Sequence, residues 1–187
     1  MDNRQSLLER VRQYIARHIP LSYQHLVLVG LSGGADSVAL LSILTELGYR
    51  CEACHCNFGL RGEESLRDRR FAESVATELG VPFREVAFDT LAYAEANKVS
   101  VEMACRELRY AWFEQQRREA GAAYVGRGSP SRRFHRDDVA QPHTRYGNSG
   151  TYRYTTGERF GNTSLVVAQP SRDRIVPFRC TSLFCRR

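Results

Sequence analysis

Lysine is almost absent from this chain of 187 residues: Lys98 is the only one, and the other 26 basic residues are arginines. No apolar run reaches the roughly 18 residues that suggest a membrane-spanning helix, so we expect no membrane partner. The amphipathic stretch at residues 1–19 lacks the uninterrupted apolar segment of a secretory signal, which predicts a cytoplasmic protein. The six cysteines are therefore expected to be free thiols.

Basic residues are spread unevenly along the chain, although the formal net charge is +6. Residues 1–126 contain 15 Lys and Arg against 17 Asp and Glu, a net charge of −2. Residues 127–187 contain 12 Arg against 4 Asp and Glu, a net charge of +8. Positive charge that could bind nucleic-acid phosphates is thus confined to the tail.

Helical and strand patterns alternate up to about residue 126. Helical spacing of apolar residues predicts helices at 6–19, 36–47, 63–79, 89–96 and 101–120. Short apolar runs predict strands at 25–30, 51–56, 82–88 and 122–125. This order indicates an α/β fold with a doubly wound, Rossmann-like parallel sheet, and ligands are expected at the carboxyl ends of its strands. We expect regular order to end near Gly126.

A glycine-rich loop separates the first strand from the helix that follows it. Gly33 and Gly34 allow a tight turn whose backbone N–H groups face a ligand, and the helix N-terminus adds further donors. The Walker A pattern GxxxxGK[ST] is absent, and Asp36 would repel a bare phosphate. We therefore expect Mg²⁺ to join the Asp36 carboxylate to the phosphates. The nucleotide-binding candidates here are Ser32, Gly33, Gly34, Ala35, Asp36 and Ser37.

The string Ser32–Ser37, between an apolar strand and an amphipathic helix, resembles the SGGxDS loop of the N-type ATP pyrophosphatases. That resemblance implies an adenine nucleotide alpha hydrolase-like domain that binds ATP with Mg²⁺ and cleaves between the α and β phosphates. A simple helix cap, in which Asp36 or Ser37 satisfies the first helical turn, is the alternative interpretation.

Two further segments resemble the tRNA(Ile)-lysidine synthases of that superfamily. HCNFGLRGEES at residues 55–65 is similar to the family's H-x-N-H-x-L-R signature, from which Phe58 and Gly59 depart mildly. VEMACRELRYAWF at residues 101–113 is similar to the family's E-x-x-A-R-x-x-R-Y helix. The direct resemblance covers about residues 21–126.

Arg106, Arg109 and Tyr110 are three and four residues apart and so share one face of the predicted helix. Two guanidiniums on that face could neutralise phosphates or bind a substrate carboxylate in a bidentate manner. The alternative is a solvated face on which Glu102 and Glu107 pair with the arginines.

The histidine and cysteines of the second strand each allow two interpretations. His55, at the carboxyl end of that strand, is a candidate nucleotide or substrate contact, although a buried histidine with a satisfied ring is the simpler interpretation. Cys51, Cys54 and Cys56 have a spacing that suggests a metal site, but a strand would send Cys51 and Cys54 to opposite faces. We therefore favour ordinary strand residues.

For an intact relative, the resemblance implies a ligase that joins free L-lysine to C2 of the wobble cytidine of tRNA(Ile). The reaction would pass through an adenylated tRNA and release diphosphate and AMP. Asp36 would hold the metal, and Arg106 and Arg109 would bind a phosphate or the lysine carboxylate, which makes these three the catalytic candidates. A tRNA thiolase and an inactive ATP-binding fragment remain as alternatives, and a homodimer is left open.

The tail at residues 127–187 lacks the family's continuation, including its His-His-x-Asp-Asp motif, despite the fragment HRDD at residues 135–138. Read one nucleotide later with freely chosen synonymous codons, residues 127–154 can become VAHHRDDSIETTLLNLIRGTGIRGLTG, which restores the family pattern. We hypothesise a frameshift near Gly126, which would leave an ATP-binding domain at residues 1–126 without the family's C-terminal tRNA-binding domains. A loop-rich or disordered basic tail is the alternative, and neither gives His135, Asp137 or Asp138 the family's roles.

Overall fold

A computed structural model describes residues 3–130, 163–168 and 177–178 of the chain. The elements are α1 (Asn3–His18), β1 (Leu26–Gly30), α2 (Ala35–Glu46), β2 (Arg50–Asn57), α3 (Glu63–Glu78), β3 (Phe83–Ala87), α4 (Thr90–Asn97), α5 (Val101–Glu119), β4 (Tyr124–Pro130), β5 (Thr163–Ala168) and β6 (Pro177–Phe178). Every helix and strand expected before residue 126 is present, with its ends shifted by a few residues.

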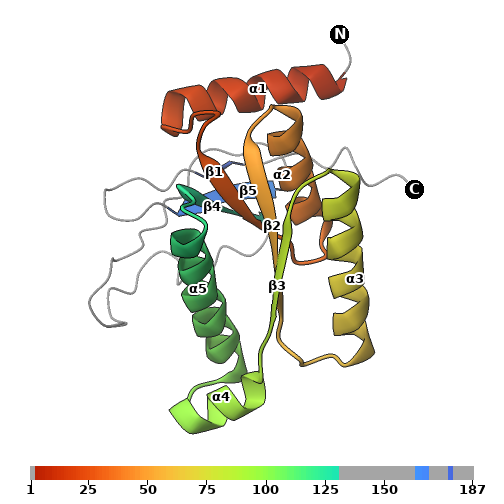
Figure 1. The fold of residues 1–187 in the computed structure, drawn as a ribbon, viewed down its shortest axis with the longest axis vertical. Helices are drawn as coiled ribbons and strands as arrows, with labels where there is room; N and C mark the ends of the chain where they lie inside the picture. The colour runs from red at the N-terminus through yellow and green to blue at the C-terminus, as the bar shows by residue number, and fades with distance from the viewer. Residues whose placement is uncertain (1–2, 131–162, 169–176, 179–187) are drawn as a thin grey trace.

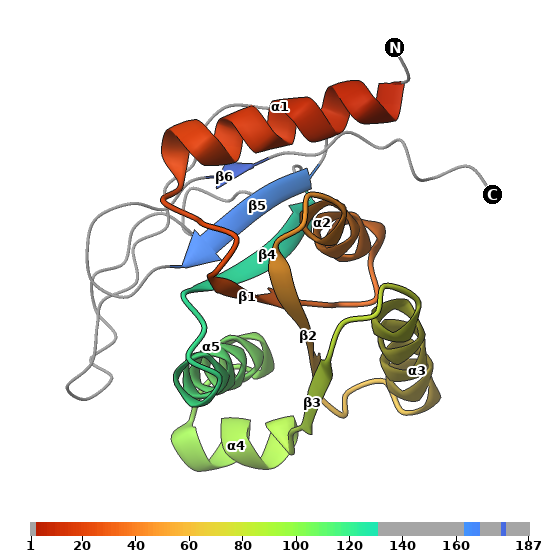
Figure 2. The same ribbon diagram turned by 45° about the horizontal axis from the view of Figure 1, so that its top comes forward.

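The six strands form one sheet in the order β3-β2-β1-β4-β5-β6 (Figures 1 and 2). The first four are parallel, whereas β5 and β6 run antiparallel to their neighbours. From the central strand β1 the chain moves outward to β2 and β3, then returns to form β4 on the other side of β1. The direction of winding therefore reverses between β1 and β4, which is where open α/β sheets place their ligands.

Helices cover both faces of the sheet (Figure 2). One apolar cluster joins α1, α2 and α3 to one face, with Val11, Ile15 and Leu41 almost fully buried. A second cluster packs Trp112 and Phe113 of α5 against the other face. The doubly wound α/β class expected from the alternating pattern is therefore confirmed. Within the described residues, no helix is long and apolar enough to cross a bilayer.

The described part of the tail corrects one expectation, namely that regular order ends near Gly126. β4 continues to Pro130, and β5 pairs with it through a register from Val125↔Ala168 to Pro130↔Thr163. The physical reason is that β4 has unpaired N–H and C=O groups along its outer edge, which a short extended segment can satisfy. His135, Asp137 and Asp138 lie outside the described residues, so their predicted lack of a role stays a prediction.

Candidate functional site

The glycine-rich loop lies at the carboxyl end of β1, where the sheet reverses its direction of winding. Gly33 has a φ of +78°, a left-handed conformation that favours glycine. Gly34 is the N-cap of α2 in an extended conformation, and no side chain caps the helix there. The N-cap residue, which has no side chain, therefore contributes no side-chain hydrogen bond to the first turn of α2, and the helix-cap interpretation stays an alternative.

Ser37 holds the loop closed. Its Oγ accepts a hydrogen bond from the backbone N–H of Ser32 at 3.2 Å and donates one to the carbonyl of Gly34 at 2.8 Å. The side chain is only 1% exposed. The Ser37 hydroxyl therefore serves the loop itself, and the hydroxyl of the exposed Ser32 lies 3.3 Å from it.

Asp68 and Gly128, which belong to no motif of the sequence, lie against this loop. A Cβ atom placed on Gly33 would lie 3.3 Å from Cγ of Asp68, so this α3 carboxylate borders the turn. A Cβ atom on Gly128 would lie 2.5 Å from both the carbonyl carbon of Asp36 and the amide nitrogen of Ser37. No local pattern marks either contact, because each joins segments far apart in the sequence.

The His55 ring contacts the backbone just before the loop. It is 4% exposed, and its Nδ1 lies 2.8 Å from the carbonyl oxygen of Leu31. Because that oxygen can only accept, Nδ1–H is the donor of this bond. This geometry favours the satisfied, structural histidine over a direct nucleotide contact.

Arginine and aromatic side chains from α5, β4 and the loop after β2 meet on the α5 side of the sheet. The guanidinium carbon of Arg109 lies 5.0 Å from the centre of the Phe58 ring. Those of Arg106 and Arg127 lie 5.8 and 5.2 Å from the centre of the Tyr110 ring. Burial and, secondarily, the nearby Arg127 lower the pKa of Arg109. The helical face predicted for Arg106, Arg109 and Tyr110 therefore forms part of a packed cluster, with Arg127 as a member that sequence reasoning missed.

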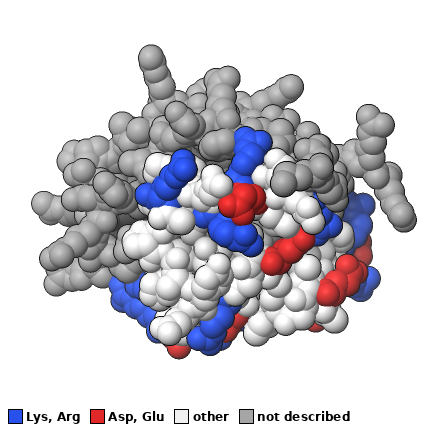
Figure 3. Space-filling view, turned by 90° about the horizontal axis from the view of Figure 1, so that it is seen from above, with Lys and Arg blue, Asp and Glu red and all other residues white. Residues whose placement is uncertain are grey.

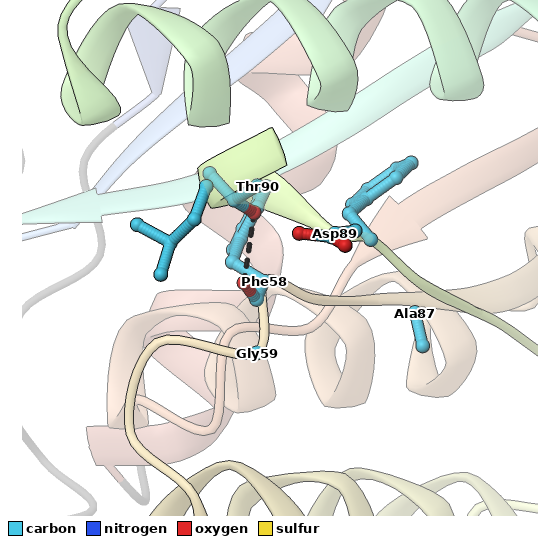
Figure 4. A pocket seen from close by; sticks show the side chains of 7 residues that line it. Phe58, Gly59, Ala87, Asp89 and Thr90 are labelled. Atoms are coloured by element: carbon cyan, nitrogen blue, oxygen red, sulfur yellow. Dashed lines mark hydrogen bonds between the residues drawn. The ribbon is translucent and has the colours of Figure 1, made fainter. Parts of the chain in front are cut away.

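A pocket of about 400 Å³ opens between the loops that follow β2 and β3 (Figure 4). Two hydrogen bonds join these loops: Thr90 Oγ1 donates to the carbonyl of Phe58, and the N–H of Phe88 donates to that of Asn57, both at 2.8 Å. The Phe58 and Phe88 rings stack with their centres 5.6 Å apart. Because Phe58 also contacts Arg109, this pocket and the arginine cluster share one wall.

The cysteines of β2 are buried thiols. Cys51 packs in the cluster on the α1–α3 side and Cys54 in the cluster on the α5 side, as the alternation of a strand predicts. Burial raises the pKa of Cys51 to about 11 and that of Cys54 and Cys56 to about 12. Thiols with such pKa values remain protonated near neutral pH and are poor nucleophiles.

Charges of both signs are interspersed on the face shown in Figure 3. Among the ion pairs of the described residues, Arg4 of α1 lies 2.7 Å from Glu46 of α2. This mixture agrees with the small net charge of residues 1–126 and shows no single large basic patch on the described part of that face.

A family model described as "PP-loop domain" matches residues 5–131. Three curated proteins called tRNA(Ile)-lysidine synthase are similar to the chain. That of Parabacteroides distasonis is 52% identical over 132 residues, or 71% of this chain and 29% of the relative. That of Porphyromonas gingivalis W83 is 50% identical over 137 residues, or 73% and 29%. That of Bacteroides thetaiotaomicron is 46% identical over 173 residues, or 92% and 37%.

The chain thus spans about a third of the length of these relatives. Among solved structures, the NH3-dependent NAD synthetase from Campylobacter jejuni is similar with a TM-score of 0.48 and 14% identity, over 65% of this chain and 52% of that one. The match to the family model covers most of the chain and includes the loop at residues 32–37, β1 to β4 and the helices between them. On this evidence, the chain belongs to the PP-loop domain family.

Proposed function

We propose that the chain binds ATP at its glycine-rich loop and takes part in the synthesis of lysidine on tRNA(Ile). The observation that carries the proposal is the loop itself, which lies at the reversal of the sheet and places Gly34, a residue without a side chain, at the N-cap of α2. Relatives called tRNA(Ile)-lysidine synthase, 46–52% identical, support the choice of reaction.

The loop supplies donors for the pyrophosphate end of ATP. The exposed Ser32 hydroxyl and the N–H groups of the first turn of α2 can donate to the phosphate oxygens. These donors also stabilise the negative charge that develops on pyrophosphate as it leaves. Ser37 and His55 act on this step indirectly, since their hydrogen bonds hold Ser32 and Leu31 in place.

Asp36 fits a role in holding Mg²⁺. Its half-buried carboxylate lies in the first turn of α2, and Mg²⁺ in nucleotide sites is commonly held by one or two carboxylates together with the phosphates. When bound, the ion neutralises phosphate charge and acts as a Lewis acid.

The proposed reaction has two steps. The C2 oxygen of the wobble cytidine attacks the α-phosphate, and the bond to pyrophosphate breaks. The ε-amine of free lysine then attacks C2, loses a proton and displaces AMP. Arg106 and Arg109 are proposed to bind a phosphate or the lysine carboxylate near these atoms.

The test is pyrophosphate release from ATP by this chain, measured with and without tRNA(Ile) and L-lysine. We expect a first turnover of release that requires tRNA(Ile), continued release that also requires L-lysine, and loss of both in Asp36→Asn, which removes the carboxylate charge and keeps the side-chain volume. Glu46→Gln is the matched control, because it neutralises a carboxylate at the far end of the same helix. ATP binding without any pyrophosphate release would support the inactive fragment, and release that needs a sulfur donor instead of lysine would support the thiolase. The frameshift hypothesis is tested by resequencing and by running the same assay on the shifted reading frame.

A further inference from the structure

Three guanidiniums gather around two aromatic rings on the α5 side of the sheet. Arg106 and Arg127 both approach the Tyr110 ring, with guanidinium carbons 5.8 and 5.2 Å from its centre. Arg109 lies over Phe58 at 5.0 Å. Arg127 comes from β4, whereas the other two arginines come from α5, so tertiary packing alone brings the three together.

The cluster borders the glycine-rich loop. In the β1–β4 register Arg127 pairs with Gly30, the residue at which β1 ends and the loop begins. The next residue along β4, Gly128, is the one whose backbone touches the first turn of α2. A Cβ atom on Gly30 would lie 2.8 Å from the Phe113 ring, which is one helical turn from Arg109. The arginines and the loop donors therefore occupy one end of the sheet.

Arg109 and Arg127 bring two positive charges close together. The Arg109 side chain is half-buried, and burial, followed by the nearby Arg127, lowers its pKa. The other groups that influence it are Cys56, Tyr110 and Cys105, and no carboxylate is among them. A bound oxyanion would stabilise these two neighbouring guanidiniums, because it offsets their charge and can accept two parallel N–H hydrogen bonds from one guanidinium.

We propose that Arg127 is a substrate-binding residue that completes, with Arg106 and Arg109, a site for a phosphate group. The inference deepens the proposed function, rests on it for the identity of the substrates, and concerns the printed reading frame, in which residue 127 is arginine and not the valine of the shifted frame. A phosphate fits better than a lone carboxylate because three positive charges surround the site and phosphate groups offer more oxygen acceptors. Two sources carry this chemistry: ATP itself and the backbone of the RNA substrate.

Arg127→Gln tests the proposal, with Arg70→Gln of the exposed surface of α3 as the matched control. Affinities are measured for a nonhydrolysable ATP analogue with Mg²⁺ and, separately, for a tRNA(Ile) anticodon stem-loop at several salt concentrations. We expect Arg127→Gln to weaken one of the two by about tenfold or more, as truncation of a charged hydrogen-bonding group does. If the RNA supplies the phosphate, the slope of the logarithm of RNA affinity against the logarithm of salt concentration should also become shallower by roughly the contribution of one phosphate contact. The control should leave both affinities unchanged.

Arg127→Lys separates binding from folding. Lysine keeps the charge without the guanidinium fork, so it should recover part of the lost affinity. The melting temperature without ligand should fall little in Arg127→Gln, because the substitution relieves repulsion between the positive charges of Arg127 and Arg109. Unchanged affinities in Arg127→Gln, or a loss of affinity fully explained by unfolding, would overturn the proposal. These binding measurements need no catalytic turnover. If Arg127→Gln weakens binding but the chain shows no lysine-dependent pyrophosphate release, the result contradicts the proposed function and leaves the binding proposal standing.

Discussion

Replacing Gly33 by alanine should destabilise the chain much more than replacing Gly34, although the two glycines are adjacent. Gly33 has a φ of +78°, and an L-residue in the left-handed region costs about 1–2 kcal/mol. Its new Cβ would also lie 3.3 Å from Cγ of Asp68, closer than ordinary contact. Gly34 has a φ of −88° and a ψ of 151°, which any residue adopts, and its new Cβ would find Ser32 Oγ at 3.5 Å.

We therefore expect Gly33→Ala to lower the free energy of unfolding by about 1–2 kcal/mol, and Gly34→Ala to change it by less than about 0.5 kcal/mol. For a chain of this size, about 1 kcal/mol corresponds to roughly 2–4 °C in melting temperature. The assay is thermal unfolding followed by circular dichroism in nucleotide-free buffer, so that lost ligand contacts do not contribute. Urea unfolding should show unchanged m-values.

Two variants separate the backbone strain of Gly33→Ala from the close contact of its new Cβ with Asp68. Gly33→Asn should be less harmful than Gly33→Ala, because asparagine tolerates the left-handed region better while keeping the same Cβ contact. Combining Gly33→Ala with Asp68→Ala should recover only the part of the lost unfolding free energy that comes from the Cβ–Asp68 contact, and a double-mutant cycle measures that part. Equal destabilisation by Gly33→Ala and Gly34→Ala, or no effect of either, would refute the reasoning from backbone geometry.

Three further predictions follow from packing and titration. Gly128→Ala should lower the free energy of unfolding by about 1–3 kcal/mol and weaken ATP binding, because its Cβ would lie 2.5 Å from backbone atoms of Asp36 and Ser37. Differential scanning calorimetry measures the first effect, and titration calorimetry with the ATP analogue measures the second. Cys54, with a pKa near 12, should resist iodoacetamide at pH 8 in the native chain and react in urea, as peptide masses will show. The hydrogen bond from Arg69 lowers the pKa of Glu85 below its ordinary 4.5, so the stabilisation is present above that value and is lost as pH falls through the lowered pKa. Glu85→Gln should therefore narrow the stability difference between pH 7 and pH 3, and an unchanged difference would contradict this assignment.

Much of the fold could be predicted because its signals are local. β1 is a continuous apolar run whose three central residues are at most 1% exposed, as a central parallel strand requires. α5 follows the helical period from its Ser100 cap, whose Oγ accepts from the N–H of Met103. The strands of the tail could not be predicted in the same way, since β5 exists only because the outer edge of β4 is there to pair with it.

The roles of individual site residues were harder to predict. The pattern SGGxDS indicated that Ser32 and Ser37 belong together, and they do, but it could not show which hydroxyl turns inward. The answer depends on Ser37 facing the interior of the first helical turn, where it is 1% exposed and bonds to the loop. His55 likewise needed the neighbouring strand to show that its ring supports Leu31.

The sequence by itself determined the alternation of strands and helices, the glycine-rich loop between the first strand and its helix, and the helical face that carries Arg106 and Arg109. Each of these depends on backbone preferences and side-chain periodicity over a few residues. Only the tertiary structure decided that Asp68 borders the loop, that Gly128 touches the first turn of α2, and that Arg127 joins the arginine cluster. These contacts arise from how the sheet winds around β1, which brings together segments that no local pattern connects.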